Sequence, residues 1–170
     1  MRTVDLNESE VVLCSRYAAQ QICFSRSRGA TRHHGGSSSR RLGGIFGDYV
    51  LGIMAELAVS KYLGMEFKPP VLGDYESADL GGVCEVKASD HPKSGLLIYK
   101  SQQHDEKLYT HVRFDGFTAQ FKGWIFGKEA KGPMVWKPKY DTPCYRLDTK
   151  YLNPIETMPM DGRRFVKERR

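Results

Sequence analysis

The sequence predicts an α/β fold of the α+β kind, built as one domain over residues 1–170. Two observations support this prediction. The hydrophobic pattern alternates between helical spacing and short strand-like runs, in the order helix, three strands, helix, strand. Hydrophobic residues make up 40% of the chain and aromatic residues 11%, which suffices for one hydrophobic core but not comfortably for two.

The first predicted element is a helix from about Asn7 to Phe24, with its apolar residues gathered on one side. Asn7 is followed three positions later by Glu10, a spacing that resembles a capping box. We expect this helix to cover one face of the core.

The positive charge of the chain is concentrated in two segments. Residues 24–44 contain no acid and five arginines, which are Arg26, Arg28, Arg32, Arg40 and Arg41. Residues 162–170, which include Arg163 and Arg164, carry a net charge of +4. Together the two segments carry +9 against +6 for the whole chain, so the remainder carries −3. This distribution predicts a flexible basic loop at about 25–43 and a basic tail at about 160–170 that bind a polyanion, the alternative being that they only aid solubility.

A second, mostly buried helix is predicted over residues 44–64, with Gly64 as its stop signal. Glu56 is the only acid on its main apolar stripe. A carboxylate on an apolar face is costly unless it is paired or bound to a metal ion. Glu56 therefore belongs to a metal site, pairs with a buried Lys or Arg, or lies in water at the edge of the stripe.

Residues 77–89 are predicted to form a β-hairpin with Gly81-Gly82 as its turn. Because alternate side chains of a strand share a face, Glu85 and Lys87 point the same way, and Asp79 comes alongside Glu85 from the preceding strand. Adjacent carboxylates repel each other unless a cation lies between them, and such oxygen ligands suit Mg²⁺ or Mn²⁺. A lysine beside that ion could orient a bound water or neutralise charge on a phosphate.

At Asp79, Glu85 and Lys87 the chain resembles the PD-(D/E)xK nuclease superfamily. The signature of that superfamily is an acid, a variable gap, then Asp or Glu, any residue and Lys. The proline that often precedes the first acid is absent, since Ala78 stands there. Many members also carry a glutamate on the helix before the hairpin, and Glu56 is similar in type and placement.

The resemblance implies a restriction-endonuclease-like core over roughly residues 44–127, with a mixed β-sheet flanked by helices. It implies a catalytic set of Glu56, Asp79, Glu85 and Lys87. It also implies Mg²⁺ or Mn²⁺ as the cofactor, held by Asp79, Glu85, Glu56 and the backbone carbonyl of Val86. Asp74 is an alternative ligand close to Asp79 in the sequence.

Further strands are predicted at residues 65–68, 96–99, 108–114 and 118–125, with a helical segment at 101–107. In several branches of the superfamily a polar residue after the third core strand faces the site, which points to Lys100, Ser101 or Gln102 as a substrate contact. The β-rich C-terminal end of the chain, which includes Trp136, looks like that of phage and prokaryotic members.

We therefore expect a Mg²⁺-dependent deoxyribonuclease that hydrolyses phosphodiester bonds in DNA, located in the cytoplasm, or in the host cytoplasm if phage-encoded. A homodimer would suit cleavage of both strands. No uninterrupted apolar run approaches 18 residues, so no membrane association is expected. Two alternatives stay open. One is a non-catalytic nucleic-acid-binding module that keeps the fold. The other is a zinc-dependent DNA-binding protein that uses Cys14 or Cys23 with His33 and His34.

Overall fold

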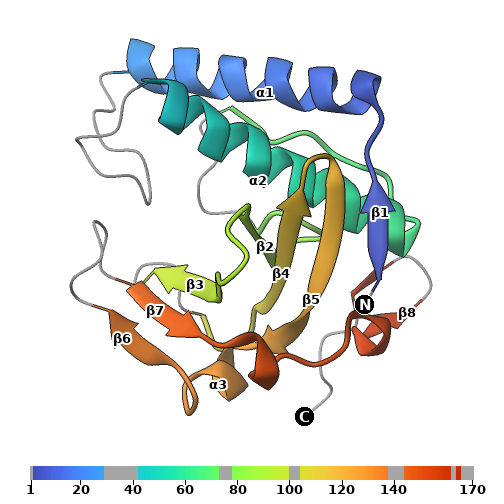
Figure 1. Cartoon of the computed structure of the whole chain (residues 1–170), viewed down its shortest axis with the longest axis vertical. Helices are drawn as coiled ribbons and strands as arrows, with labels where there is room; N and C mark the ends of the chain where they lie inside the picture. The colour runs from blue at the N-terminus through green and yellow to red at the C-terminus, as the bar shows by residue number, and fades with distance from the viewer. Residues whose placement is uncertain are drawn as a thin grey trace.

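The computed structural model describes residues 2–28, 42–72, 78–99, 104–137, 144–161 and 164–165. These residues form an α+β structure with two long helices, a four-stranded mixed sheet and two smaller antiparallel sheets (Figure 1). The predicted class, a mixed sheet with helices packed against it, is therefore confirmed.

The two long helices are α1, Glu8–Ser27, and α2, Leu42–Leu63. The capping box of α1 is present as predicted. The Asn7 side chain accepts a hydrogen bond from the Glu10 amide at 3.0 Å, and the Glu10 carboxylate accepts one from the Asn7 amide at 2.8 Å. Helix α2 ends before Gly64, whose φ of +64° is readily adopted by glycine.

Helix α1 packs along α2, and α2 in turn packs against the main sheet (Figure 1). By length and composition α2 is able to cross a membrane, and it is the one such helix in the described part of the chain. Its C-terminal half nevertheless contributes residues such as Ala55, Ala58 and Val59 to the core, which is how core helices of globular proteins also pack.

The main sheet has the strand order β1-β5-β4-β2. Its strands are β1 (Thr3–Asp5), β2 (Cys84–Ser89), β4 (Leu108–Asp115) and β5 (Thr118–Phe126). Strands β2 and β4 run parallel with Lys87 opposite His111, whereas β5 is antiparallel to both β4 and β1. The strands predicted at 108–114 and 118–125 are confirmed.

The C-terminal part is rich in short strands, as predicted. Strands β3 (Leu96–Tyr99), β7 (Cys144–Leu147) and β6 (Val135–Lys137) form an antiparallel sheet in that order. Helix α3 spans Gly127–Ala130, and two short 3₁₀ helices span Thr149–Tyr151 and Ile155–Thr157. Strands β8 (Met160–Asp161) and β9 (Arg164–Phe165) pair within the segment predicted as a basic tail.

The predicted hairpin is only partly present. Gly81 and Gly82 form a turn, with φ of +58° and +72°, but only one residue before it pairs, through a single bridge between Leu80 and Cys84. Strand β2 instead finds its main partner in β4, over six residue pairs. The short segment before the turn offers too few residues for a competing ladder.

Two other local predictions are wrong. Residues 65–68 form no strand, because the Met65 amide bonds the Ser60 carbonyl at 2.9 Å and continues the end of α2. Residues 104–107, the described part of the predicted 101–107 helix, form a turn. The strand predicted at residues 96–99 is confirmed as β3, and it belongs to the smaller antiparallel sheet.

Buried apolar side chains form two clusters on opposite faces of the main sheet. The larger lies between the sheet and the two helices and includes Cys84, Val86 and Val112. The smaller lies between the main sheet and the second sheet, and its members are Leu96, Ile98, Tyr109, Ile125, Ala130 and Leu147. Alternation along β4 sends Val112 to the first cluster and Tyr109 to the second.

Candidate active site

The centre of the site is Glu85 on β2, with Lys87 beside it. Cys84 and Val86 face the larger core, so Glu85 and Lys87 stand on the other face of the strand, as their alternation predicts. The Lys87 Nζ atom lies 3.0 Å from Glu85 Oε2. The predicted adjacency of these two residues is therefore confirmed.

A second lysine, which the sequence analysis missed, also binds Glu85. The Lys107 Nζ atom lies 2.6 Å from Glu85 Oε1, and the side chains of Lys107 and Glu85 are only 19% and 8% exposed. Lys107 directly precedes β4, whose first residue pairs with Cys84. Its nearness to Glu85 depends on the parallel pairing of β2 with β4, so no local sequence pattern marks it.

The two lysines decide the charge state of Glu85. Burial alone would raise the pKa of its carboxyl group, but the Lys87 charge and the hydrogen bonds from Lys107 and Lys87 lower the pKa below its usual value. Glu85 is therefore an ionised, strongly paired carboxylate.

Asp79 lies at the open edge of the sheet, because β2 is an edge strand among the described strands. Its Oδ2 atom accepts a hydrogen bond from the Val86 amide at 2.6 Å. The amide and carbonyl of one strand residue point to the same edge, so the Val86 carbonyl is also turned away from β4. Burial raises the pKa of Asp79 to about 6, while the Lys87 charge opposes that shift and the Glu85 charge adds to it.

Glu56 reaches the same group of residues from α2. Burial raises the pKa of Glu56 well above its usual value, and the neighbouring Asp79 charge raises it further, whereas Lys87 lowers it. Glu56 thus lies near the charges of Asp79, Glu85 and Lys87. Its role as a metal ligand stays a prediction.

These oxygen donors have the chemistry that Mg²⁺ and Mn²⁺ prefer, namely carboxylates with one backbone carbonyl. Two of the carboxylates, Glu56 and Asp79, have raised pKa values because they are buried close to another negative charge, and a bound cation would relieve that cost. By this criterion the residues fit a divalent cation.

The arrangement still requires a change before it can hold such an ion. Both oxygens of Glu85 are engaged by lysines. Within the described ranges, no three His, Cys, Asp or Glu side chains are grouped closely enough to hold a metal as they stand. Glu85 would have to exchange a lysine contact for the ion.

The predicted nucleic-acid contacts are only partly open to description. Arg26 is exposed near the end of α1, and the Arg28 guanidinium lies 5.1 Å from the centre of the Phe24 ring. Of Arg164, which lies in β9, only the backbone is described. The remaining predicted contacts lie outside the described part of the chain, and they are Arg32, Arg40, Arg41, Lys100, Ser101, Gln102 and Arg163. Asp74, the alternative metal ligand, also lies outside it.

The four cysteines are free thiols, of which Cys23 alone is exposed. Burial raises the pKa of Cys14 to about 11, and the charges of Glu56 and Glu10 add to the shift. Cys14 lies within the larger core, whereas Cys23 is exposed. His33 and His34 lie outside the described residues, so the zinc alternative stays a prediction.

Comparisons of the chain with known protein families, with curated proteins and with solved structures found no match.

Proposed function

We propose that the chain is a nuclease that depends on Mg²⁺ or Mn²⁺, has a restriction-endonuclease-like core and cleaves DNA at the open edge of β2. The observation that carries this proposal is that Asp79, Glu85 and Lys87 lie at one edge of the sheet, with the Asp79 charge also acting on Glu56 of α2. Glu56 comes from α2, Asp79 from the turn before β2, and Glu85 and Lys87 from β2 itself. Buried acids are rare, and a group of buried and partly buried acids beside a lysine is typical of a functional site.

Each residue has a role that its contacts support. A divalent ion held by Asp79, Glu85, Glu56 and the Val86 carbonyl would supply Lewis acidity and an activated water. The Val86 amide fixes Asp79 at the edge of the strand. Glu85 holds the Lys87 ammonium group 3.0 Å away, where it can stabilise negative charge that develops on a phosphate.

The proposal is tested with Lys87→Ala and Glu85→Gln in assays of DNA cleavage with Mg²⁺ or Mn²⁺. We expect turnover to fall by roughly 100-fold or more in each variant, because each removes charge from the reacting centre, while DNA binding is largely retained. Lys150→Ala, a substitution of an exposed lysine in the 3₁₀ helix Thr149–Tyr151, is the matched control. Undiminished cleavage by purified, folded Lys87→Ala protein would refute the proposal.

A second candidate function is a non-catalytic nucleic-acid-binding module. It is favoured by the engagement of both Glu85 oxygens with Lys87 and Lys107, which resembles a structural ion triad. Calorimetric titration with Mn²⁺ distinguishes the two candidates. The module predicts DNA binding with neither metal binding nor turnover, whereas the nuclease predicts saturable metal binding that Glu85→Gln weakens.

A further inference from the structure

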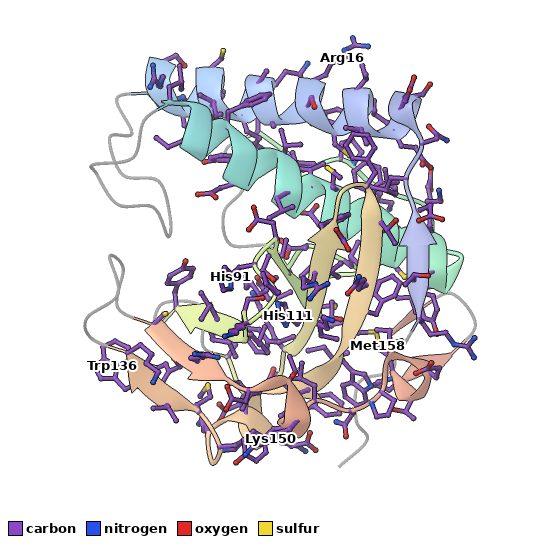
Figure 2. The ribbon with its side chains drawn as sticks, in the orientation of Figure 1. Arg16, His91, His111, Trp136, Lys150 and Met158 are labelled. Atoms are coloured by element: carbon purple, nitrogen blue, oxygen red, sulfur yellow. The ribbon has the colours of Figure 1, made fainter. Side chains whose placement is uncertain are left out.

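The face of the main sheet that points away from α2 is divided into two parts. One part, with Tyr109 and Ile125, is covered by the second sheet and belongs to the smaller core. The other part carries polar and basic side chains next to the candidate active site. Its central residue is His111, which lies opposite Lys87 in the register and is only 1% exposed (Figure 2).

Two buried nitrogen atoms in this part have no hydrogen-bond partner. Of the buried side-chain N and O atoms in the described residues, three lack a partner, and two of these are His111 Nδ1 and Arg113 Nε. His111 and Arg113 are two positions apart on β4, so their side chains share a face. An unpaired buried polar atom is uncommon in folded proteins and signals an absent partner such as an ion or a water.

Positive charge is gathered at the same place. Burial lowers the pKa of His111 to about 4, and the Lys122 charge adds to that shift. Burial also lowers the pKa of Lys122, and here the Arg113 charge adds to the shift. The Lys122 ammonium group donates a hydrogen bond to Gln120 Oε1 at 3.1 Å.

The hydrogen bonds of His111 leave its second nitrogen available as a donor. The Nε2 atom lies 3.0 Å from Ser89 Oγ, and Ser89 Oγ is also hydrogen-bonded to Ser94 Oγ. When Ser94 donates to Ser89 and Ser89 donates to Nε2, the imidazole proton resides on Nδ1. The floor of the patch then presents an N–H group beside two cations.

We propose that His111, Arg113 and Lys122 form a binding site for a phosphate group. Charged N–H groups that face each other are the usual partners of phosphate oxygens. The side chains of Arg113 and Lys122 are partly exposed, so a phosphate can approach from solvent. Strand β4 lies about 4.8 Å from β2 and Lys87 is opposite His111. If the proposed nuclease function holds, the ligand is therefore a backbone phosphate next to the scissile one.

The site is tested first with inorganic phosphate on the full chain, by NMR of ¹⁵N-labelled histidine and arginine side chains at constant ionic strength. We expect saturable shifts of the His111 and Arg113 signals, and roughly tenfold weaker binding in Arg113→Gln and Lys122→Met. Arg16→Gln, on the outer side of α1, removes a charge far from the site and serves as the control (Figure 2). Shifts that do not saturate, or that are unchanged in both variants, would overturn the proposal.

The second arm uses a short oligodeoxynucleotide without metal, to separate a backbone phosphate from a free one. We expect Arg113→Gln and Lys122→Met each to lower the affinity for the oligonucleotide by roughly tenfold. Each should also reduce the slope of log affinity against log salt concentration by about one. Inorganic phosphate binding that depends on these residues, with oligonucleotide binding that does not, would overturn the assignment to a backbone phosphate.

The two proposals fail in different ways. Phosphate and oligonucleotide binding that depends on Arg113 and Lys122, in a protein that never cleaves DNA, would refute the nuclease and leave this site standing. Metal-dependent cleavage with an unchanged KM in Arg113→Gln and Lys122→Met would refute the site and leave the nuclease standing.

Discussion

Glu85 lies between two ammonium groups, and this arrangement makes Lys107 the least expected residue of the site. Lys107 competes with any cation for the Glu85 Oε1 atom, at 2.6 Å. It also adds a positive charge that repels a divalent ion. Lys107 is therefore expected to weaken metal binding in the free protein and to become available to a phosphate once an ion takes its place.

Lys107→Met should raise the affinity for Mn²⁺ by roughly tenfold, because it removes both the competitor and the repulsion. Isothermal titration with Mn²⁺ measures this affinity directly. Lys131→Met, which removes an exposed ion pair with Asp105, should leave the affinity unchanged. Weaker Mn²⁺ binding in Lys107→Met would contradict the competition and would favour a purely structural ion triad.

His111 should make stability depend on pH in a defined window. Among the described residues, the Lys122 charge acts on it, and Lys87 lies opposite it in the strand register. Its pKa is lowered to about 4 in the folded protein and is about 6.5 in the unfolded chain, so between these values the unfolded state binds more protons. The free energy of unfolding should therefore fall as the pH drops from 6.5 to 4, by up to about 3 kcal/mol.

The measurement is urea unfolding of the wild type and of His111→Asn across this pH range. The variant should lose the part of the pH dependence of the free energy of unfolding that His111 contributes. Asp79, whose pKa is raised to about 6, increases the free energy of unfolding as the pH falls. This contribution is the same in both proteins, so it cancels in the difference between them. His91→Asn, at an exposed position, is the control, and parallel curves for wild type and His111→Asn would contradict the prediction.

At the scale of elements, Gly123 of β5 lies where the pairing with β4 is irregular, next to the polar part of the sheet. Gly123 has a φ of +128°, and a side chain there would collide with the Asn153 carbonyl oxygen. Asn153 exchanges two backbone hydrogen bonds with Trp124, at 2.8 and 3.0 Å. The pairing of β4 with β5 shifts register after His111, so Gly123 and the neighbouring Lys122 lie where the ladder is irregular.

Gly123→Ala should lower the free energy of unfolding by about 2 to 4 kcal/mol, because it combines a steric collision with an unfavourable backbone conformation. Chemical denaturation measures the change. Gly132→Ala places the same methyl group in open space and should change stability by less than about 0.5 kcal/mol. Equal stability of the two variants would show that the backbone at Gly123 relaxes without cost.

The same scale separates what the sequence could predict from what it could not. Helices α1 and α2, the Asn7 capping box and strands β4 and β5 have long periodic patterns or specific local contacts, and all were predicted. Strand β1 has three residues, too few for a periodic signal. The parallel partner of β2 depends on a contact between distant segments, which no local pattern encodes.

The candidate site divides in the same way. The adjacency of Glu85 and Lys87 follows from strand alternation and was predictable, whereas the metal site proposed for Glu56, Asp79 and Glu85 stays a prediction. Lys107 and the patch of His111, Arg113 and Lys122 come together only through the β2–β4 and β4–β5 registers. Their roles could not be predicted from the sequence, because the sequence does not reveal those strand registers.

At the scale of the whole molecule, the buried carboxylates predict that metal binding stabilises the fold. An ion that binds the folded chain at 100 times its dissociation constant contributes about 2.7 kcal/mol, which for a chain of this size raises Tm by roughly 5–10 °C. Thermal unfolding with Mg²⁺, and with NaCl at equal ionic strength as the control, measures this shift. The shift should disappear with EDTA and shrink in Glu85→Gln, and an unchanged Tm with Mg²⁺ would argue against a metal site.

The two hydrophobic clusters have a consequence for cooperativity. Among the described residues the smaller one has six buried members, and the second sheet contributes three of them, Leu96, Ile98 and Leu147. A unit held by so few contacts is expected to open at a lower free energy than the core beneath α2. Native-state amide exchange should therefore be faster in β3 and β7 than in the centre of β4. Such openings would transiently expose Tyr109 and Ile125 of the main sheet while the rest of the protein stays folded.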